Sequence, residues 1–194
     1  MEFENLLINT ENNITTISIN RPNNLNALNI ETLEEIAKAI NLSIDNDKTK
    51  CIIITGVGDK AFIAGADIKE FLEYDSSNAY IFSETGNKLL FEVVENSPKP
   101  IIAMINGYAL GGGLELAMAC HIRVASKDSR MGLPEVSLGI IPGYGGTKRL
   151  PLLVGKGRAM EMIITGRMIN AEEAKSFGLI NHIVKKEKLI DFCN

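Results

Sequence analysis

Two glutamates, Glu115 and Glu135, stand next to glycine-rich segments of this chain, and their positions suggest acid–base chemistry. Glu115 closes the segment 107–115, and Glu135 lies shortly before the segment 139–146. Carboxyl groups beside exposed backbone N–H groups could provide an acid, a base and a site for an oxyanion. This combination suits reactions next to an activated carbonyl group.

The segment 107–115 reads as the end of a strand, a glycine turn and the start of a helix. Glycine lets a ligand approach the backbone closely, and the first N–H groups of a helix lack internal partners. Gly111, Gly112 and Gly113 therefore predict a place where an anion or a developing oxyanion is stabilised. The alternative stays open that these glycines only permit tight packing and that Glu115 only complements the helix dipole. The segment does not match the GxGxxG or GxxxxGK[ST] loops that bind nucleotide phosphates.

A second junction of small residues lies at 64–67, where a strand is expected to pass into a helix. Taken alone, Asp67 fits a structural helix cap, and a glutamate that follows a proline, like Glu135, fits a solvated surface residue. All three signals occur in one chain in this order, and together they indicate a functional site.

The elements that must position these residues alternate between strands and helices. Alternating apolar and polar residues predict strands over 3–8 and 14–20, joined as a hairpin at residues 12–13. Asn29 is expected to cap a helix, because apolar residues then recur at helical spacing. Apolar runs at 50–55 and 101–106 predict buried strands of a parallel sheet.

Several further segments follow the same alternation. A strand is expected at 122–125, and helices are expected over 67–74, 78–94, 114–120, 147–153, 157–164 and 171–177. This order predicts an α/β layered fold. A length of 194 residues fits one domain with a substantial core, and no repeat or linker divides it.

Composition excludes several classes of function. The net charge is −4, so no basic field invites nucleic acid or an anionic membrane, and no apolar stretch is long enough to span a bilayer. No signal peptide is visible. Cys51, Cys120 and Cys193 form no CxxC pattern, and the histidines His121 and His182 are isolated. We therefore expect no disulfide framework, no metal site and a reducing cytoplasm as the location.

Four segments carry a resemblance to a known family: 21–28, 62–69, 100–116 and 133–143. They are similar to the enoyl-CoA hydratase/isomerase (crotonase) family, and within it to the short-chain 3-hydroxyacyl-CoA dehydratases. The resemblance implies a crotonase-like spiral of ββα units, with residues 1–194 as a single core domain. It implies reversible hydration of short-chain trans-2-enoyl-CoA thioesters.

The resemblance also implies a role for each residue of the site. The N–H groups of Ala66 and Gly112 would hold the thioester oxygen. Glu115, as a carboxylate, would deprotonate the water that attacks Cβ, and Glu135, starting protonated, would give a proton to Cα. The N–H of Gly143 would help to hold the water.

The resemblance implies that coenzyme A is bound by the segments 25–27 and 64–69 and that Tyr144 lines the acyl pocket. The matched residues are Leu25, Asn26, Ala27, Ala64, Ala66, Asp67, Ile68 and Lys69. Tyr144 would narrow the acyl pocket and favour short chains. No cofactor beyond the coenzyme A of the substrate is implied, and the expected partners are an acyl-CoA thioester and further copies in a homotrimer or hexamer.

One departure and two alternatives accompany this interpretation. Family members usually continue into several C-terminal helices, so we expect most of that region to be missing here and activity to be weakened. An enoyl-CoA isomerase needs a single carboxylate, matched by Glu135, and the presence of Glu115 favours hydration instead. A non-catalytic, oligomeric acyl-CoA-binding protein is the other alternative.

Overall fold

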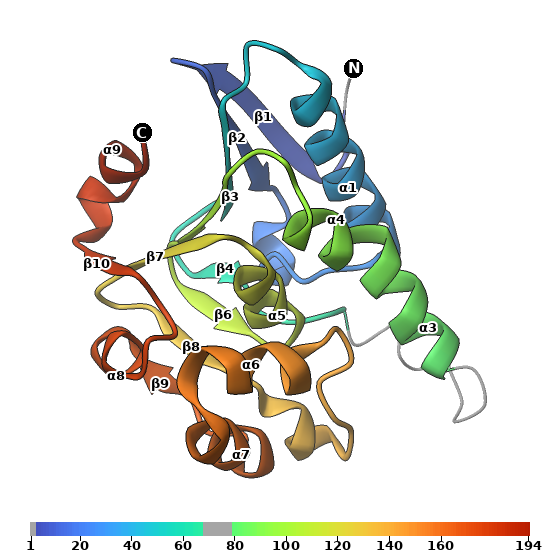
Figure 1. Cartoon of the computed structure of the whole chain (residues 1–194), viewed down its shortest axis with the longest axis vertical. Helices are drawn as coiled ribbons and strands as arrows, with labels where there is room; N and C mark the ends of the chain where they lie inside the picture. Colours follow the sequence, from blue (N-terminus) through green and yellow to red (C-terminus); the bar gives the residue numbers. More distant parts are fainter. Residues whose placement is uncertain (1–2, 68–78) are drawn as a thin grey trace.

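The N-terminal hairpin predicted from the alternating residues is present, but its first strand spans Leu6–Glu11 and not the predicted residues 3–8. The computed structural model describes residues 3–67 and 79–194 (Figure 1). Strand β1 (Leu6–Glu11) pairs antiparallel with β2 (Ile14–Ile19). Asn12 and Asn13 between them have φ values of 50° and 66°. Asparagine tolerates this left-handed conformation, and two such residues make a turn whose twist matches that of the strands.

A six-stranded sheet forms the larger layer, in the order β1-β2-β3-β5-β7-β10. Its remaining strands are β3 (Cys51–Gly56), β5 (Ile101–Ile105), β7 (Ile122–Ser126) and β10 (His182–Val184). From β2 onward neighbouring strands pair in parallel. Ile52, Ile53 and Ile54 are fully buried, which confirms the prediction that the apolar run is covered on both faces.

A second sheet of four short strands lies beside the first, in the order β4-β6-β8-β9. These strands are β4 (Ala61–Ile63), β6 (Tyr108–Leu110), β8 (Arg130–Gly132) and β9 (Ile169–Asn170). Three times the chain passes from the first sheet to the second: β3 leads to β4, β5 to β6 and β7 to β8. This spiral of strand pairs confirms the predicted α/β class.

Helix α1 packs on β1 and β2 of the six-stranded sheet, α4 packs against α1, and α3 continues this helical run along the right of Figure 1. They span α1 (Ile30–Asp45), α3 (Ala79–Gly86) and α4 (Glu92–Glu95), and the π-helical segment Asn87–Phe91 joins the last two. The side chain of Asn29 accepts the N–H of Thr32 and so caps α1, as predicted. The helix predicted over 78–94 is confirmed, with the π-helical segment as an addition. The helix predicted over 67–74 lies outside the described residues.

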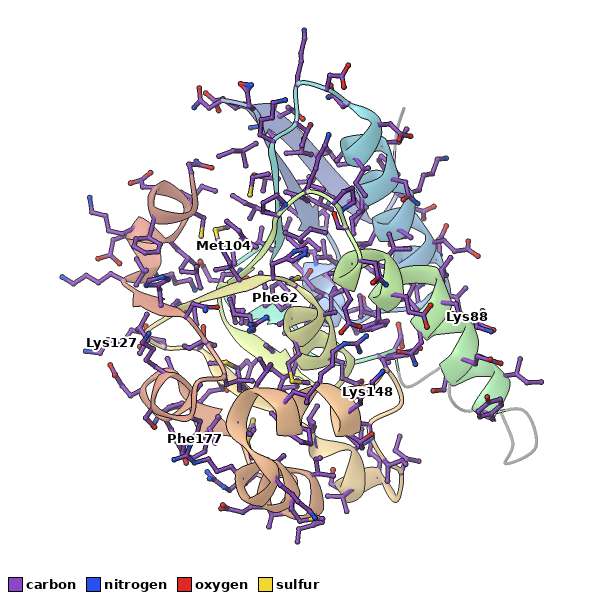
Figure 2. All side chains as sticks on the ribbon, viewed as in Figure 1. Phe62, Lys88, Met104, Lys127, Lys148 and Phe177 are labelled. Carbon is purple, nitrogen blue, oxygen red and sulfur yellow. The ribbon has the colours of Figure 1, made fainter. Side chains whose placement is uncertain are left out.

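The opposite face of the same sheet is covered by the last helix, α9 (Leu189–Cys193). Its Leu189 packs with Ile53 and Met104, whereas the alternate residues Ile52 and Ile54 belong to the main core. Figure 2 labels Met104 on this side and Phe62 near the centre of the molecule. Alternation along β3 thus divides the buried side chains between two layers.

Helix α5 (Gly112–Ala119) is buried along its whole length and lies near the centre of Figure 1. It begins at Gly112 rather than at the predicted Leu114, because the glycines themselves adopt the first helical turn. Three further helices follow below it: α6 (Gly146–Val154), α7 (Lys156–Thr165) and α8 (Ala171–Phe177). Their predicted positions are confirmed to within one residue. None of the helices in the described part of the chain could cross a membrane.

Candidate active site

The two glutamates predicted from the sequence line one cavity of about 640 Å³. Its walls come from five places: the end of β4, helix α3, the start of α5, the 3₁₀ helix Pro134–Leu138 and the loop that leads to α6. The lining includes Ala64, Gly65, Ala66, Ser83, Gly111, Gly112, Glu115, Glu135, Gly143 and Tyr144. Segments far apart in the sequence therefore meet where the sequence predicts the chemistry.

Glu115 projects from the first turn of α5, and its side chain is almost fully buried, with 1% of its surface exposed. Its Oε1 accepts the backbone N–H of Tyr144 at 2.8 Å and that of Gly146 at 2.7 Å. Gly146 is the first residue of α6. The carboxyl group therefore lies at the positive end of α6 as well as in the first turn of its own helix.

The environment of Glu115 raises its pKa to about 8. Burial is the largest cause, because it penalises the charged form, and the negative charge of Glu135 acts in the same direction. The N–H groups of Gly146 and Tyr144 and the charge of Arg149 lower it. A buried carboxyl group with its pKa near neutrality is suited to accept and return a proton.

Glu135 reaches the cavity from the 3₁₀ helix Pro134–Leu138. Its Oε2 is buried and has no hydrogen-bond partner within the described part of the chain, and burial raises the pKa of this carboxyl group. A Cβ on Gly111 would lie 2.9 Å from its Oε1. Glycine is therefore needed at position 111 for the Glu135 side chain to approach α5, which joins the two motifs into one site.

Ala66 and Gly112 line the same cavity from two neighbouring segments. A Cβ on Gly112 would lie 3.7 Å from the nitrogen of Ala66, so the two segments are close together. Leu28 holds the first segment through hydrogen bonds to Gly65 (2.9 Å) and from Asp67 (2.7 Å). Neither the Ala66 amide nor the Gly112 amide donates to another group of the described residues. Two such amides on one side of a cavity could bind an oxyanion.

The loop 139–146 forms another wall of the cavity. Asn87 donates to the carbonyl oxygen of Gly143 at 3.0 Å, and the Ser83 hydroxyl donates to the same oxygen. The ring of Tyr144 stacks on Phe91 with centroids 4.7 Å apart. A Cβ on Gly86 would overlap the Tyr144 ring, so the glycine makes room for it. The loop is thus held by the helical run Ala79–Glu95, a support that sequence reasoning missed.

The segment 25–27, which the resemblance assigned to coenzyme A, packs against the segment that carries Ala66. The backbone oxygen of Leu25 accepts the N–H of Ala64 at 3.1 Å. Asn26 is 1% exposed, and its Nδ2 donates to the carbonyl oxygens of Val57 (3.0 Å) and Ala61 (2.9 Å). The Asn26 side chain therefore stabilises the loop, and any ligand contact at this position would be made by the backbone.

Arg21 contacts both segments of the predicted coenzyme A region, 25–27 and 64–67. Its Nη2 lies 3.1 Å from Oδ2 of Asp67, and its Nη1 donates to the carbonyl oxygen of Ala27. Asp67 is thus engaged in an ion pair, a contact that its sequence position did not indicate. Ile68 and Lys69, also predicted for this region, lie outside the described residues.

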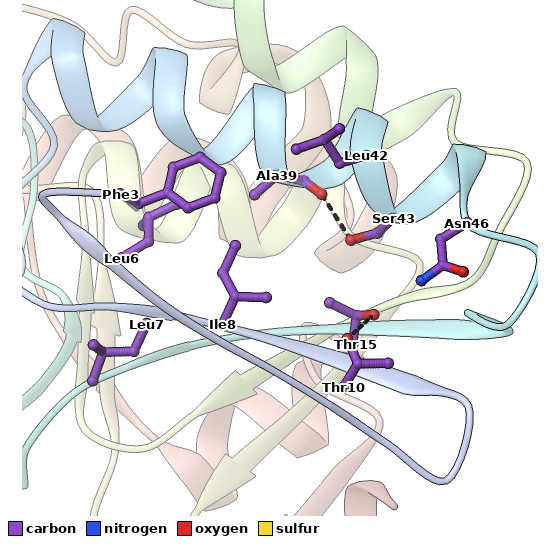
Figure 3. A pocket seen from close by; sticks show the side chains of 10 residues that line it. All are labelled: Phe3, Leu6, Leu7, Ile8, Thr10, Thr15, Ala39, Leu42, Ser43 and Asn46. Carbon is purple, nitrogen blue, oxygen red and sulfur yellow. Dashed lines mark hydrogen bonds between the residues drawn. The ribbon is translucent and has the colours of Figure 1, made fainter. Parts of the chain in front are cut away.

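The other large cavity lacks a comparable set of groups. A second cavity of about 510 Å³ lies between the β1–β2 hairpin and α1 (Figure 3). Side chains such as Phe3, Leu42 and Thr15 line it, and none of its lining residues is an acid, a base or a thiol. Residues 3–67 and 79–194 contain no group of three potential metal ligands.

Comparison with known proteins identifies similar sequences and structures. The family described as enoyl-CoA hydratase/isomerase matches residues 9–192. The chain is 46% identical over 190 residues to "Crotonyl-CoA hydratase" of Syntrophomonas wolfei, covering 98% of this chain and 73% of that protein. It is also 46% identical over 192 residues to "Short-chain-enoyl-CoA hydratase" of Clostridium acetobutylicum, with the same coverage of both chains.

A solved structure shows the same fold. The crystal structure of an enoyl-CoA hydratase from Bacillus anthracis superimposes with a TM-score of 0.92 at 41% sequence identity. The superposition covers 98% of this chain and 74% of the other. The crotonase-like fold expected from the sequence is therefore confirmed.

Proposed function

The chain belongs to the enoyl-CoA hydratase/isomerase family, and we propose that it reversibly hydrates short-chain trans-2-enoyl-CoA thioesters to 3-hydroxyacyl-CoA. The observation that carries this proposal is the convergence of Glu115, Glu135 and the Ala66 and Gly112 amides on one cavity. Two carboxyl groups and a pair of backbone donors are the groups that adding water across an enoyl thioester requires.

The first requirement is to polarise the thioester carbonyl. We assign this role to the N–H groups of Ala66 and Gly112, which would donate to the thioester oxygen. Gly112 is the first residue of α5, so the positive end of that helix adds to the field at the oxygen. Negative charge that develops on the oxygen is stabilised there, and Cβ of the enoyl group becomes electrophilic.

The second requirement is to move two protons around one water molecule. Glu115, as a carboxylate, takes a proton from the water while the water oxygen forms a bond to Cβ. Glu135, initially protonated, gives its proton to Cα as the enolate returns to the thioester. Dehydration follows the same path in reverse. The raised pKa values of both groups support this exchange, and the titration of Glu115 depends on Glu135 because the Glu135 charge raises the pKa of Glu115.

The presence of Glu115 favours hydration over double-bond isomerisation. Moving a double bond needs one carboxyl group to carry a proton between two carbons, and Glu135 alone would suffice. Glu115 is buried, and two backbone donors hold its carboxyl group. A carboxylate held in this way is suited to orient a water molecule, for which isomerisation has no use. We propose that the N–H of Gly143 assists in holding that water.

The remaining assignments concern binding. We propose that coenzyme A lies along the segments 25–27 and 64–69 and that Tyr144 limits the acyl pocket to short chains. No cofactor is required by this mechanism. We further propose a single crotonase-like core domain, a homotrimer or hexamer, and a cytoplasmic location, which the free thiols of Cys51, Cys120 and Cys193 would suit.

The proposal is tested by following the loss of the conjugated enoyl thioester when the protein is mixed with crotonyl-CoA. Turnover that falls by at least about a hundredfold in Glu115→Gln and in Glu135→Gln is the expected result. Glu172→Gln, which alters an exposed glutamate on α8, is the matched control. Absence of turnover in the wild-type protein, together with retained binding of coenzyme A, would point to a binding protein instead.

A further inference from the structure

Arg149 on α6 is a buried cation that the mechanism above does not use. Its side chain is 9% exposed and makes contacts on two sides. Its Nη1 donates to the carbonyl oxygen of Tyr144 at 2.8 Å. Its Nη2 and Nε donate to Oε2 of Glu95 at 2.7 Å and 3.2 Å. One guanidinium group thus joins the end of α4 to the turn before α6.

That turn carries the carboxyl group of Glu115. The Tyr144 residue donates its N–H to Glu115 and accepts from Arg149 through its carbonyl oxygen. A Cβ on Gly145 would overlap Nη1 of Arg149, so the guanidinium lies directly against the turn. Gly146, on the other side, supplies the second N–H to Glu115. Removing the Arg149 side chain would remove its hydrogen bond to the turn and so disturb the N–H groups of Tyr144 and Gly146 that donate to Glu115.

We propose that Arg149 is a positioning residue for Glu115, holding the turn 144–146 that binds its carboxylate and keeping that carboxylate charged for proton abstraction. This inference rests on the proposed function, because it matters only if Glu115 acts as the base. Arg149 is not among the residues that line the cavity, so it acts on the reaction through Tyr144 and Gly146.

Charge supports the same role. Glu115 and Glu135 line one cavity while Arg149 lies behind the turn, and the positive charge of Arg149 lowers the pKa of Glu115. Glu95 pairs with Arg149 from the far side and is about half exposed, so solvent screens its negative charge. The Arg149 charge is therefore only partly compensated, and some of its field remains to stabilise the Glu115 carboxylate.

Three variants separate this role from a merely structural one. Arg149→Gln removes both the charge and the fork of donors, Arg149→Lys keeps the charge, and Glu95→Gln removes the partner while leaving the bond to Tyr144. Lys148→Gln is the matched control, because it removes one positive charge from an exposed side chain on the same helix (Figure 2).

The first readout is the pH profile of kcat/KM for crotonyl-CoA hydration. In Arg149→Gln the acid limb should move upward by about one pH unit, with a roughly tenfold loss at neutral pH that shrinks toward alkaline pH. In Arg149→Lys the acid limb of the pH profile should lie closer to its wild-type position than in Arg149→Gln. In Glu95→Gln it should stay or move downward, and in Lys148→Gln it should not move. An unchanged limb in a folded Arg149→Gln protein would overturn the inference.

The second readout does not depend on turnover. The ionisation of Glu115 is followed by NMR of protein labelled with ¹³C at the glutamate carboxyl groups, and Glu115→Gln identifies its signal. Arg149→Gln should raise the Glu115 pKa relative to the wild-type protein. A raised pKa without hydratase activity would reject the proposed function and with it the catalytic role of Arg149, leaving only its effect on the ionisation of Glu115. Hydratase activity with an unchanged pKa would reject the inference and keep the function.

Discussion

The backbone N–H of Gly146 donates to Oε1 of Glu115 at 2.7 Å, which places the carboxyl group of α5 at the N-terminus of α6. The alternative left open by the sequence was that Glu115 only complements the dipole of its own helix. This alternative explains part of the environment of the carboxyl group. It does not explain why the group is buried beside a second carboxyl group. Burial raises the pKa of Glu115 to about 8, a cost to stability that a purely structural role would not require.

The first prediction concerns how the buried Glu115 carboxyl group changes the stability of the fold with pH. An unfolded glutamate loses its proton near pH 4.5, whereas folded Glu115 keeps it up to about pH 8. Between these values the folded state binds more protons, so this residue lowers the free energy of unfolding as the pH rises. Glu115→Gln removes the effect and keeps an oxygen for both N–H groups. Its stability relative to the wild-type protein should rise steadily from about pH 5 to about pH 8.

Urea unfolding at several pH values measures this difference, with Glu172→Gln as the control for removing a charge from an exposed site. A difference between Glu115→Gln and wild type that is independent of pH would show that the folded state does not hold the proton.

A second prediction concerns the oxyanion site. A methyl group on Gly112 would lie 3.4 Å from the Tyr144 ring and 3.7 Å from the Ala66 nitrogen, so it fits the protein but intrudes between the two amides. Gly112→Ala should therefore fold normally and lose about a hundredfold to a thousandfold in kcat. Crotonyl-CoA hydration and thermal unfolding measure the two properties.

The neighbouring glycine supplies the contrast. A Cβ on Gly113 would overlap the backbone oxygen of Ile63, so Gly113→Ala should lower the melting temperature because the backbone itself must shift. Near wild-type kcat in a folded Gly112→Ala protein would remove the assigned oxyanion role.

A third prediction concerns the length of the acyl chain. Tyr144 is 4% exposed, lines the cavity and stacks on Phe91, so its ring occupies space that a longer acyl chain would need. Tyr144→Ala should raise kcat/KM for a six-carbon substrate relative to a four-carbon one by about tenfold, since each of the two added methylenes contributes about 0.8 kcal/mol when buried. Tyr144→Phe keeps the ring and should keep the short-chain preference. An unchanged ratio in Tyr144→Ala would place the end of the acyl pocket elsewhere.

A fourth prediction separates the two glutamates. If Glu135 alone can carry a proton between carbons, Glu115→Gln should lose hydration by about a hundredfold or more while retaining most of any isomerase activity. Glu135→Gln should lose both. Assays with trans-2-enoyl and trans-3-enoyl thioesters measure the two activities, and parallel losses in Glu115→Gln would contradict the division of roles.

Long, regular patterns in the sequence predicted the longer helices and the buried strands β3, β5 and β7 of the larger sheet, but not its edge strand β10 or the last helix α9. The short strands β6, β8 and β9 were missed, because two or three residues carry too little periodicity to be recognised. Their pairing depends on neighbours brought together by the spiral rather than on local preference. The π-helical segment Asn87–Phe91 was missed for a similar reason, since its apolar spacing resembles that of an ordinary helix.

The candidate site shows the same division. Glu115, Glu135 and the glycines stand in recognisable motifs, and the structure brings them to one cavity. Arg149 and Glu95 are separated by 54 positions, and no local sequence pattern predicts their contact. Likewise, Asn26 reads as a possible ligand contact but is used to join three backbone segments. Contacts between distant segments depend on tertiary packing, which spacing in one sequence does not encode.

The most direct test of the proposed function is hydration of crotonyl-CoA in water labelled with ¹⁸O and deuterium, followed by mass spectrometry and NMR of the product. The mechanism predicts 3-hydroxybutyryl-CoA with solvent oxygen at Cβ and one solvent hydrogen at Cα, and predicts that Glu115→Gln and Glu135→Gln nearly abolish its formation. Deuterium exchange or double-bond migration without incorporation of solvent oxygen would contradict the assignment of this protein as a hydratase.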